Sequence, residues 1–377
     1  MAAWDKRDDM IVYEEEPFNA EPPAAALADR PITPLDTFYS RNHGPILQID
    51  PDSWRLRVDG VVRRPLVLSL AQLRARFPER TMVATLLCAG NRRAELAAVR
   101  PIPDEVPWGS GVISTARWTG VSLADVLAAA EPWPDAGHVA FGAADVSELA
   151  DPPQPFGGSV PMSKAMAGEV LLAWEMDGAP LPPAHGAPVR VVVPGYIGAR
   201  SVKWVEHIHV QEQPSDNYFQ ASAYRLLPAD VDPAAAAAGA GLSLGPLAVN
   251  AAILTPEDGQ ALPPGPNRIS GYAIAGDGRG VARVDVRVET PGSRQGTGPD
   301  ANGASPWRQA DLGPAPSPWA WRLWDTTVRI PPGPVDIVAR AWDTSATVQP
   351  EQPATLWNPK GYGNNAWTRV RVTGRAA

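Results

Sequence analysis

The sequence has 377 residues, with 33 basic and 41 acidic side chains and a formal net charge of −8. This length is enough for two domains with separate cores, and the net acidity argues against nucleic acid or an anionic membrane as the main partner. A single cysteine excludes an intrachain disulfide, while 43 prolines and 33 glycines indicate a loop-rich fold that contains strands.

The first residues of the chain are charged, and no apolar run of the secretory type follows them. No stretch of about 18 apolar residues occurs anywhere, so we expect no membrane span and a cytoplasmic location. We interpret residues 1–35 as an irregular arm that lies over the surface, and we assign no chemistry to it.

The next segment, 36–240, is predicted to be a first domain that mixes strands with short helices. Two capping-box patterns, Ser-x-x-Gln from Ser69 and Ser-x-x-Asp from Ser122, predict a helix after each serine, the first ending near Phe77. Apolar and alternating runs predict strands at 54–60, 82–87, 138–145, 170–176, 189–193 and 202–210.

The strand at 82–87 leads into Cys88, and the small residues Ala-Gly-Asn at 89–91 are typical of a tight turn. Arg92 and Arg93 follow, and we predict that they lower the pKa of the Cys88 thiol and favour the thiolate that ligates metals. A lone cysteine after an apolar run is, on general grounds, more often a core residue. These residues alone leave both interpretations open.

A second group of polar residues surrounds the apolar run 189–193. His185, Arg190 and Lys203 lie on either side of a glycine-rich turn. Exposed backbone amides beside such side chains can bind an anion. The alternative is a strand that ends in a surface turn with incidental charges.

Alternation over 202–210 places Val205, His207 and His209 on one face of a strand. A His-x-His pair can bind zinc or copper. No third ligand with metal-site spacing is visible in the sequence, so a solvated strand face is the simpler interpretation.

An alanine-rich stretch at 228–246 separates the two halves of the chain, and we place the domain boundary near residue 240. Beyond it, short alternating runs with proline-rich turns predict an all-β sandwich of immunoglobulin-like type in 241–377. The whole chain is therefore predicted to be α+β. Strands are expected at 249–254, 268–275, 281–288, 321–330, 335–342 and 367–372.

The string Cys-Ala-Gly-Asn-Arg-Arg at 88–93, together with Val-Arg-Pro at 99–101, Trp108 and the run 113–118, closely resembles the sulfite oxidase family of molybdenum enzymes. The segments 185–204 and 357–367 resemble that family as well, so the likeness covers nearly the whole chain from about residue 35. It implies a mixed α/β molybdopterin domain followed by an immunoglobulin-like domain that forms a homodimer.

The resemblance also implies roles for individual residues. It makes Cys88 the protein ligand to molybdenum in a Mo-molybdopterin cofactor. The residues expected to act on the substrate are Arg41, Arg93, Trp108, Tyr224 and Lys360. The residues expected to bind the cofactor are Phe38, Tyr39, Ser40, Arg41, Asn42, Asp145, His185, Arg190, Ser201, Val202 and Lys203.

The implied reaction is the oxidation of sulfite to sulfate by two-electron oxygen-atom transfer. No cytochrome-b5-like region is recognised, so we predict no haem in this chain and a separate electron acceptor, a cytochrome or oxygen. Many family members have an arginine where this chain has Lys360, which keeps the charge but lacks the planar fork. Two alternatives are another oxyanion or sulfoxide reaction, such as nitrate reduction, and a cofactor-free binding protein on the same fold.

Overall fold

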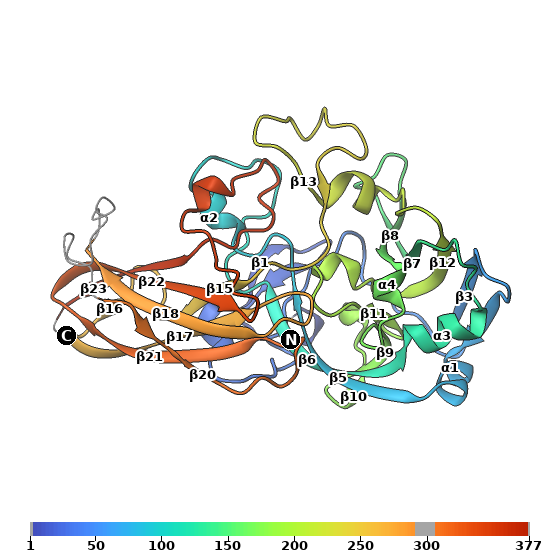
Figure 1. The fold of residues 1–377 in the computed structure, drawn as a ribbon, viewed down its shortest axis with the longest axis horizontal. Helices are drawn as coiled ribbons and strands as arrows, with labels where there is room; N and C mark the ends of the chain where they lie inside the picture. Colours follow the sequence, from blue (N-terminus) through green and yellow to red (C-terminus); the bar gives the residue numbers. More distant parts are fainter. Residues whose placement is uncertain (1–2, 291–305, 376–377) are drawn as a thin grey trace.

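The protein is described here by a computed structural model that covers residues 3–290 and 306–375. The molecule is elongated, with the strands of the C-terminal half at one end and those of the N-terminal half, mixed with short helices, at the other (Figure 1). This arrangement agrees with the predicted α+β organisation.

Two five-stranded sheets form the framework of the N-terminal half. One has the order β10-β9-β6-β5, with β11 also paired to β9, and the other has the order β4-β3-β12-β7-β8. Their strands are β3 (Arg55–Gly60), β4 (Leu66–Ser69), β5 (Glu79–Leu87), β6 (Ile113–Ser122), β7 (His138–Ser147), β8 (Gln154–Pro161), β9 (Leu171–Met176), β10 (Ala179–Pro180), β11 (Arg190–Val192) and β12 (Val205–Gln211). The neighbours are antiparallel apart from β3 and β12, which are parallel.

The helices of the described residues are short. They are α1 (Leu70–Arg76), α2 (Arg93–Ala97), α3 (Leu123–Ala130) and α4 (Met162–Ala165), with single turns η1 (Ala3–Asp5), η2 (Ala24–Leu27), η3 (Pro183–His185), η4 (Gly198–Arg200), η5 (Phe219–Ala223) and η6 (Pro353–Thr355). Both predicted helices are present. Ser69 forms the predicted capping box with Gln72, but Ser122 makes no side-chain cap bond.

The C-terminal half contains a four-stranded sheet, β15-β17-β21-β20, and a five-stranded sheet, β16-β23-β22-β18-β19. Their strands are β15 (Asn250–Thr255), β16 (Ala261–Leu262), β17 (Gly265–Ile274), β18 (Val281–Glu289), β19 (Arg308–Gln309), β20 (Asp311–Leu312), β21 (Arg322–Ile330), β22 (Gly333–Asp343) and β23 (Thr368–Gly374). Apolar side chains from both sheets form one core. The six predicted strands are all present, and the immunoglobulin-like sandwich is confirmed. A small pair, β13 (Arg225–Leu226) with β14 (Leu242–Ser243), lies between the two halves of the sequence.

The N-terminal arm differs from its prediction, because it is part of the packed structure. It contains the hairpin β1 (Ile11–Glu14) and β2 (Asn19–Glu21), and all three residues of β2 are buried. The carboxylate of Glu21 accepts hydrogen bonds from the backbone N–H of Gly109 (2.6 Å) and of Gly111 (2.8 Å). The arm therefore holds the loop that precedes β6.

The predicted face pattern of β12 is wrong at its start. Val205 is buried in the same core as Ile208 and Val210, whereas His207 and His209 are half-exposed. A register shift against β7 falls between Val205 and His207, and the preceding Trp204 has a φ of 47°. Such a bulge inserts one residue and changes the face on which the next side chains lie.

Among the residues that the structure describes, no helix is long and apolar enough to cross a bilayer.

Candidate functional site

A pocket in the N-terminal half collects most of the predicted site residues. It lies against the end of β5, the loop before β3 and the turns around β11. Its lining includes Phe38, Tyr39, Ser40, Arg41, Asn42, His43, Cys88, Asp145, Phe156, His185, Arg190, Ser201, Lys203, Trp204 and Tyr224.

Cys88 lies directly after β5 and is 6% exposed. Its backbone N–H donates to the carbonyl of Val112 (3.0 Å), which fixes the turn against the start of β6. Burial raises the pKa of the Cys88 thiol, while the guanidinium of Arg41 and, more weakly, that of Arg93 favour the thiolate. Arg93 lowers this pKa as predicted, but the predicted net lowering is wrong, because burial outweighs the nearby charges.

Arg92 extends away from the pocket toward the C-terminal half and is fully buried. Its guanidinium donates to the carbonyls of Ala251 (3.0 Å) and Ala366 (2.8 Å) and forms an ion pair with Glu95 (2.7 Å). It also occupies the left-handed region, with a φ of 64°, at the start of α2. This residue links the Cys88 turn to the strands that follow residue 240.

Arg93, by contrast, remains beside the Cys88 turn. Its guanidinium donates to the carbonyls of Lys360 (3.0 Å) and Val106 (2.8 Å), and it pairs with Glu105 (3.0 Å). The ring of Tyr362 lies 5.0 Å from the guanidinium carbon. Lys360 thus contacts Arg93 through its backbone carbonyl. The side chain of Lys360 has no hydrogen bond or ion pair within residues 3–290 and 306–375.

Cationic side chains gather at another part of the pocket wall. Arg190 donates to the carbonyls of His185 (3.0 Å) and Ser201 (2.9 Å). Lys203 donates to the side-chain oxygen of Asn42 and to the carbonyl of Ala184 (3.2 Å). Lys6 of the arm reaches the same place, since its Nζ lies 2.8 Å from Nε2 of His185.

The electrostatics of this cluster favour the binding of an anion. Burial lowers the pKa of Lys203 and of His185 well below their usual values, and the neighbouring cations lower both further. Burial also lowers the pKa of Lys6 to about 7. A bound phosphate would offset both the desolvation and the mutual repulsion of these groups.

Asp145 is the acidic member of the pocket lining. Burial raises the pKa of its carboxyl to about 6, although Lys203 opposes this shift. One of its oxygens, Oδ1, is buried without a hydrogen-bond partner in the part of the chain that the structure describes. A buried carboxylate oxygen without a partner is costly, so it is well suited to accept a hydrogen bond from a ligand.

Tyr224 and His43 form a hydrogen-bonded pair in the pocket lining. The hydroxyl of Tyr224 lies 2.7 Å from Nε2 of His43. Burial and the nearby charges of Arg41 and Lys203 hold the pKa of His43 well below its usual value, so the ring is neutral and can accept a hydrogen bond from the tyrosine hydroxyl. The ring of Tyr362 stacks on Tyr224 at a centroid distance of 5.4 Å.

Four predicted residues do not line this pocket. Arg93 lies beside the Cys88 turn, while Trp108 is 1% exposed and packs in the same apolar cluster as Cys88. Val202 is a core residue, and the backbone carbonyl of Lys360 accepts a hydrogen bond from Arg93. The sequence analysis missed Lys6, His43 and Tyr362. His43 had a local signal, because it belongs to the string that contains Arg41 and Asn42, and Tyr362 lies within the segment 357–367 that resembles the family, whereas Lys6 had none.

Two family descriptions match the chain. Residues 43–219 match the oxidoreductase molybdopterin binding domain, and residues 243–375 match the Mo-co oxidoreductase dimerisation domain. The protein is therefore an oxidoreductase of the molybdopterin-dependent class, and the predicted cofactor is confirmed. Cys88 as a soft sulfur donor, the cation cluster and the Asp145 oxygen suit the metal, the phosphate and the pterin ring of such a cofactor.

Individual relatives show to which family within this class the chain belongs. Over 369 residues the chain is 43% identical to sulfite oxidase from Gallus gallus, covering 95% of this chain and 76% of that protein. It is 41% identical to mitochondrial sulfite oxidase from Homo sapiens and spans 65% of that relative's length. The solved structure of the sulfane dehydrogenase SoxCD from Paracoccus pantotrophus superposes with a TM-score of 0.79 at 26% identity, covering 99% of this chain and 91% of that one. The chain belongs to the sulfite oxidase family.

Proposed function

We propose that this protein oxidises sulfite to sulfate and passes two electrons to a separate acceptor, a cytochrome or oxygen. The observation that carries the proposal is the joint placement of Cys88, Arg41 and the buried cation cluster around one pocket. Bound molybdopterin supplies the two-electron oxygen-atom transfer, and the protein supplies binding, orientation and charge.

Different residues of the pocket lining are proposed to bind different parts of the cofactor. The Cys88 sulfur would be the metal ligand, and Arg190, Lys203 and Lys6 would hold the phosphate together with the ring of His185. Oδ1 of Asp145 would be available to accept a hydrogen bond from the pterin ring. The remaining proposed contacts come from Phe38, Tyr39, Ser40, Arg41, Asn42, Ser201 and the backbone of Val202.

Substrate binding depends mainly on Arg41. A guanidinium stays protonated and binds an oxyanion through two parallel N–H groups. Arg41 lines the pocket, and its charge acts on both Cys88 and Tyr224. Arg93 adds positive potential while Glu105 and two carbonyls fix its position. Trp108 supports the Cys88 turn, and Lys360 positions Arg93 through its backbone.

Tyr224 has a positioning role toward the substrate. Burial raises its pKa, so the hydroxyl keeps its proton, and neutral His43 accepts the hydrogen bond. This directs the phenol proton at His43 and fixes the phenol oxygen within the influence of the Arg41 charge. A second candidate reaction, nitrate reduction, is not favoured, because the relatives at 41% and 43% identity are sulfite oxidases.

We further propose that the chain divides at about residue 240, with an arm at 1–35, a catalytic domain at 36–240 and a dimerisation domain at 241–377. The two matched family ranges lie on either side of this boundary. A homodimer through the second domain follows from the description of that family. The cytoplasmic location stays a prediction, since the human relative is named as mitochondrial.

The deciding experiment is sulfite-dependent reduction of ferricyanide by molybdenum-loaded protein, with Cys88→Ser as the paired variant. Turnover that this substitution abolishes, at an unchanged fold by circular dichroism, supports the proposal. Molybdenum-loaded protein that reduces ferricyanide with no sulfite dependence contradicts the assignment of substrate. Absence of molybdenum after expression in a host that makes the pterin contradicts the assignment of cofactor.

A further inference from the structure

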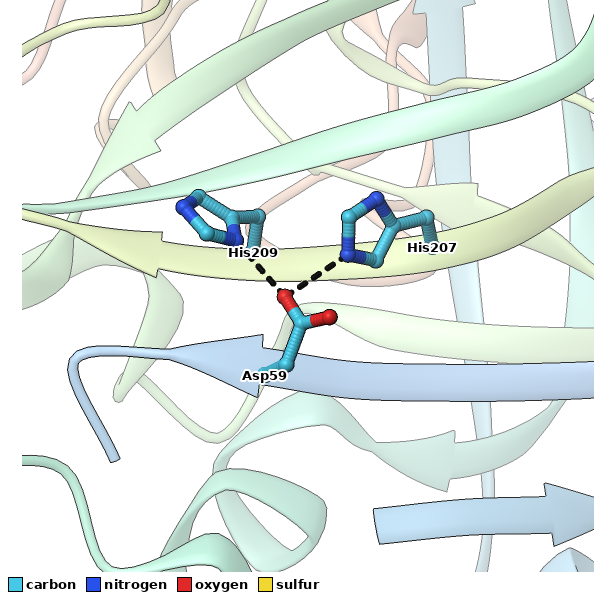
Figure 2. A group of neighbouring side chains, drawn as sticks. All are labelled: Asp59, His207 and His209. Atoms are coloured by element: carbon cyan, nitrogen blue, oxygen red, sulfur yellow. Dashed lines mark hydrogen bonds and ion pairs between the residues drawn. The ribbon is translucent and has the colours of Figure 1, made fainter. Parts of the chain in front are cut away.

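A second group of potential metal ligands lies outside the molybdopterin pocket. His207 and His209 belong to β12, and Asp59 belongs to the parallel strand β3 (Figure 2). The third ligand that the sequence pattern lacked is therefore supplied by a strand about 150 positions earlier in the chain. Parallel pairing places His209 directly opposite Asp59, and it places His207 opposite Arg57.

The three side chains converge on one point. Oδ1 of Asp59 lies 2.7 Å from Nε2 of His207 and 2.6 Å from Nδ1 of His209, as the dashed lines in Figure 2 show. The candidate ligand atoms all lie within 4.8 Å of one another. In a tetrahedral zinc site with bonds of about 2.0–2.1 Å, ligand atoms are about 3.3 Å apart. To admit the ion, the two hydrogen bonds to Oδ1 open by about 0.6 Å, and the side chains adjust until each ligand atom lies at bonding distance.

The three side chains are partly exposed to solvent, and a neighbouring arginine fixes the orientation of the carboxylate. On the other side of β12, the residues paired with His207 and His209 are Gly142 and Ala140, whose small size leaves room for the rings. The side chains of His207, His209 and Asp59 are 32%, 44% and 26% exposed. Arg57 binds the second carboxylate oxygen, Oδ2, at 3.0 Å and leaves Oδ1 directed at the imidazoles.

We propose that Asp59, His207 and His209 form a binding site for a divalent transition-metal ion, with Zn²⁺ as its ligand. Two imidazoles and one carboxylate are a donor set that zinc accepts with a water molecule as fourth ligand, and nitrogen donors disfavour Mg²⁺ and Ca²⁺. The ion connects β3 to β12 and so clamps the centre of the second sheet.

This site is independent of the proposed sulfite chemistry. None of its three residues lines the molybdopterin pocket. In Figure 1, β3 and β12 lie at the opposite end of the molecule from β16 and β23 of the C-terminal half. A homodimer formed through the C-terminal half would leave the group open to solvent.

The test is calorimetric titration of the molybdenum-loaded protein with ZnCl₂ after removal of divalent ions with a chelator and desalting. One Zn²⁺ per chain is expected for the wild type. Asp59→Asn, His207→Ala and His209→Ala should each weaken binding tenfold or more. Titration with Co²⁺ should give the visible absorption of a four-coordinate ion in the wild type and in none of these three variants.

The matched control is His138→Ala. His138 pairs with Gln211 on the same face of the sheet, and it lies outside the group of three. This variant should bind Zn²⁺ as the wild type does, and both should gain thermal stability from Zn²⁺ where Asp59→Asn does not. Equal affinity in the wild type and Asp59→Asn, or an equal loss in His138→Ala, would overturn the proposal. Because the readouts are binding and melting temperature, failure here leaves the sulfite assignment untouched.

Discussion

Two neighbouring arginines with identical chemistry have different partners in this protein. Arg92 binds Glu95 and carbonyls of the C-terminal half, whereas Arg93 binds Glu105 and stays beside the Cys88 turn. The left-handed backbone at Arg92 accounts for the divergence, because it turns the chain between the two side chains. Sequence reasoning that grouped both with Cys88 could not separate them.

Substitution of Arg92 should therefore reduce stability far more than chemistry. Arg92→Met removes a fully buried cation that satisfies several acceptors, and we expect a loss of about 3–5 kcal/mol in the free energy of unfolding. Urea denaturation monitored by tryptophan fluorescence measures this loss. A value below about 1 kcal/mol would contradict the structural role.

Substitution of Arg93 should affect turnover instead. Arg93→Met removes positive charge next to the Cys88 turn, and we expect kcat/KM for sulfite to fall on the order of 10- to 100-fold, the equivalent of one charged hydrogen bond. Molybdenum content, measured on the same sample, should remain near that of the wild type. Unchanged kcat/KM in fully loaded protein would remove Arg93 from the substrate site.

Lys6 predicts a pH dependence of stability. Burial lowers its pKa from 10.5 to about 7, so between those pH values the unfolded chain holds a proton that the folded chain lacks. Stability of the cofactor-free protein should therefore rise with pH from about 7 to 10.5, and Lys6 contributes no slope below that window. Lys6→Met should flatten this rise in denaturation curves measured across the window. Parallel stability curves for the two proteins would refute the assignment.

At the scale of elements, the two predicted helices share a capping-box sequence pattern, but only one of them forms the capping hydrogen bonds. Ser69 makes a complete capping box at α1, whereas the Ser122 hydroxyl is buried before α3 and has no hydrogen-bond partner within the described ranges. The apolar face of α3, which includes Val126 and Leu127, is enough to form that helix without the cap.

A matched pair of substitutions tests this difference. Ser69→Ala should destabilise the protein by about 1 kcal/mol, because the backbone N–H of Gln72 in α1 loses its acceptor. Ser122→Ala should be neutral or slightly stabilising, since it removes a buried hydroxyl without a partner. Thermal denaturation of both variants gives the comparison, and equal losses would contradict it.

Strands were predictable because apolar alternation is a local signal, as at β5 and β18. The packing of the arm and the face pattern at the start of β12 were not predictable, because both depend on contacts with residues far away in the sequence. Glu21 is buried because loop amides near residue 110 need an acceptor, and the face of Val205 depends on a bulge against β7. Polar residues placed by such distant partners give no periodic signal.

On the scale of the whole molecule, the candidate site combines segments that are far apart in the sequence. Cys88 and His185 could be assigned from strings that resemble a known family, each string being continuous in sequence. Lys6 belongs to no such string, and it reaches the pocket wall only through folding. Tyr362 lies within the segment 357–367 that resembles the family, but its contact with Tyr224 forms only in the folded chain. Continuous motifs are therefore the part of a site that sequence can reveal.

The proposed dimer gives a prediction at this scale. Sedimentation equilibrium at micromolar concentration should give about twice the chain mass of 40.1 kDa. Added Zn²⁺ should not change that mass, because β3 and β12 lie far from the C-terminal sandwich in Figure 1. A 40 kDa species under these conditions would contradict dimerisation.

The contacts of the buried Arg92 guanidinium also have a consequence for biosynthesis. Two of its acceptors are the carbonyls of Ala366 and Trp367, which are translated long after the Cys88 turn itself. A nascent chain that has not yet exposed these residues lacks the bonds that anchor the turn. Insertion of the pterin into a correctly shaped turn is therefore a step that follows translation, and a ribosome-stalled chain that ends before residue 366 should fail to retain molybdenum.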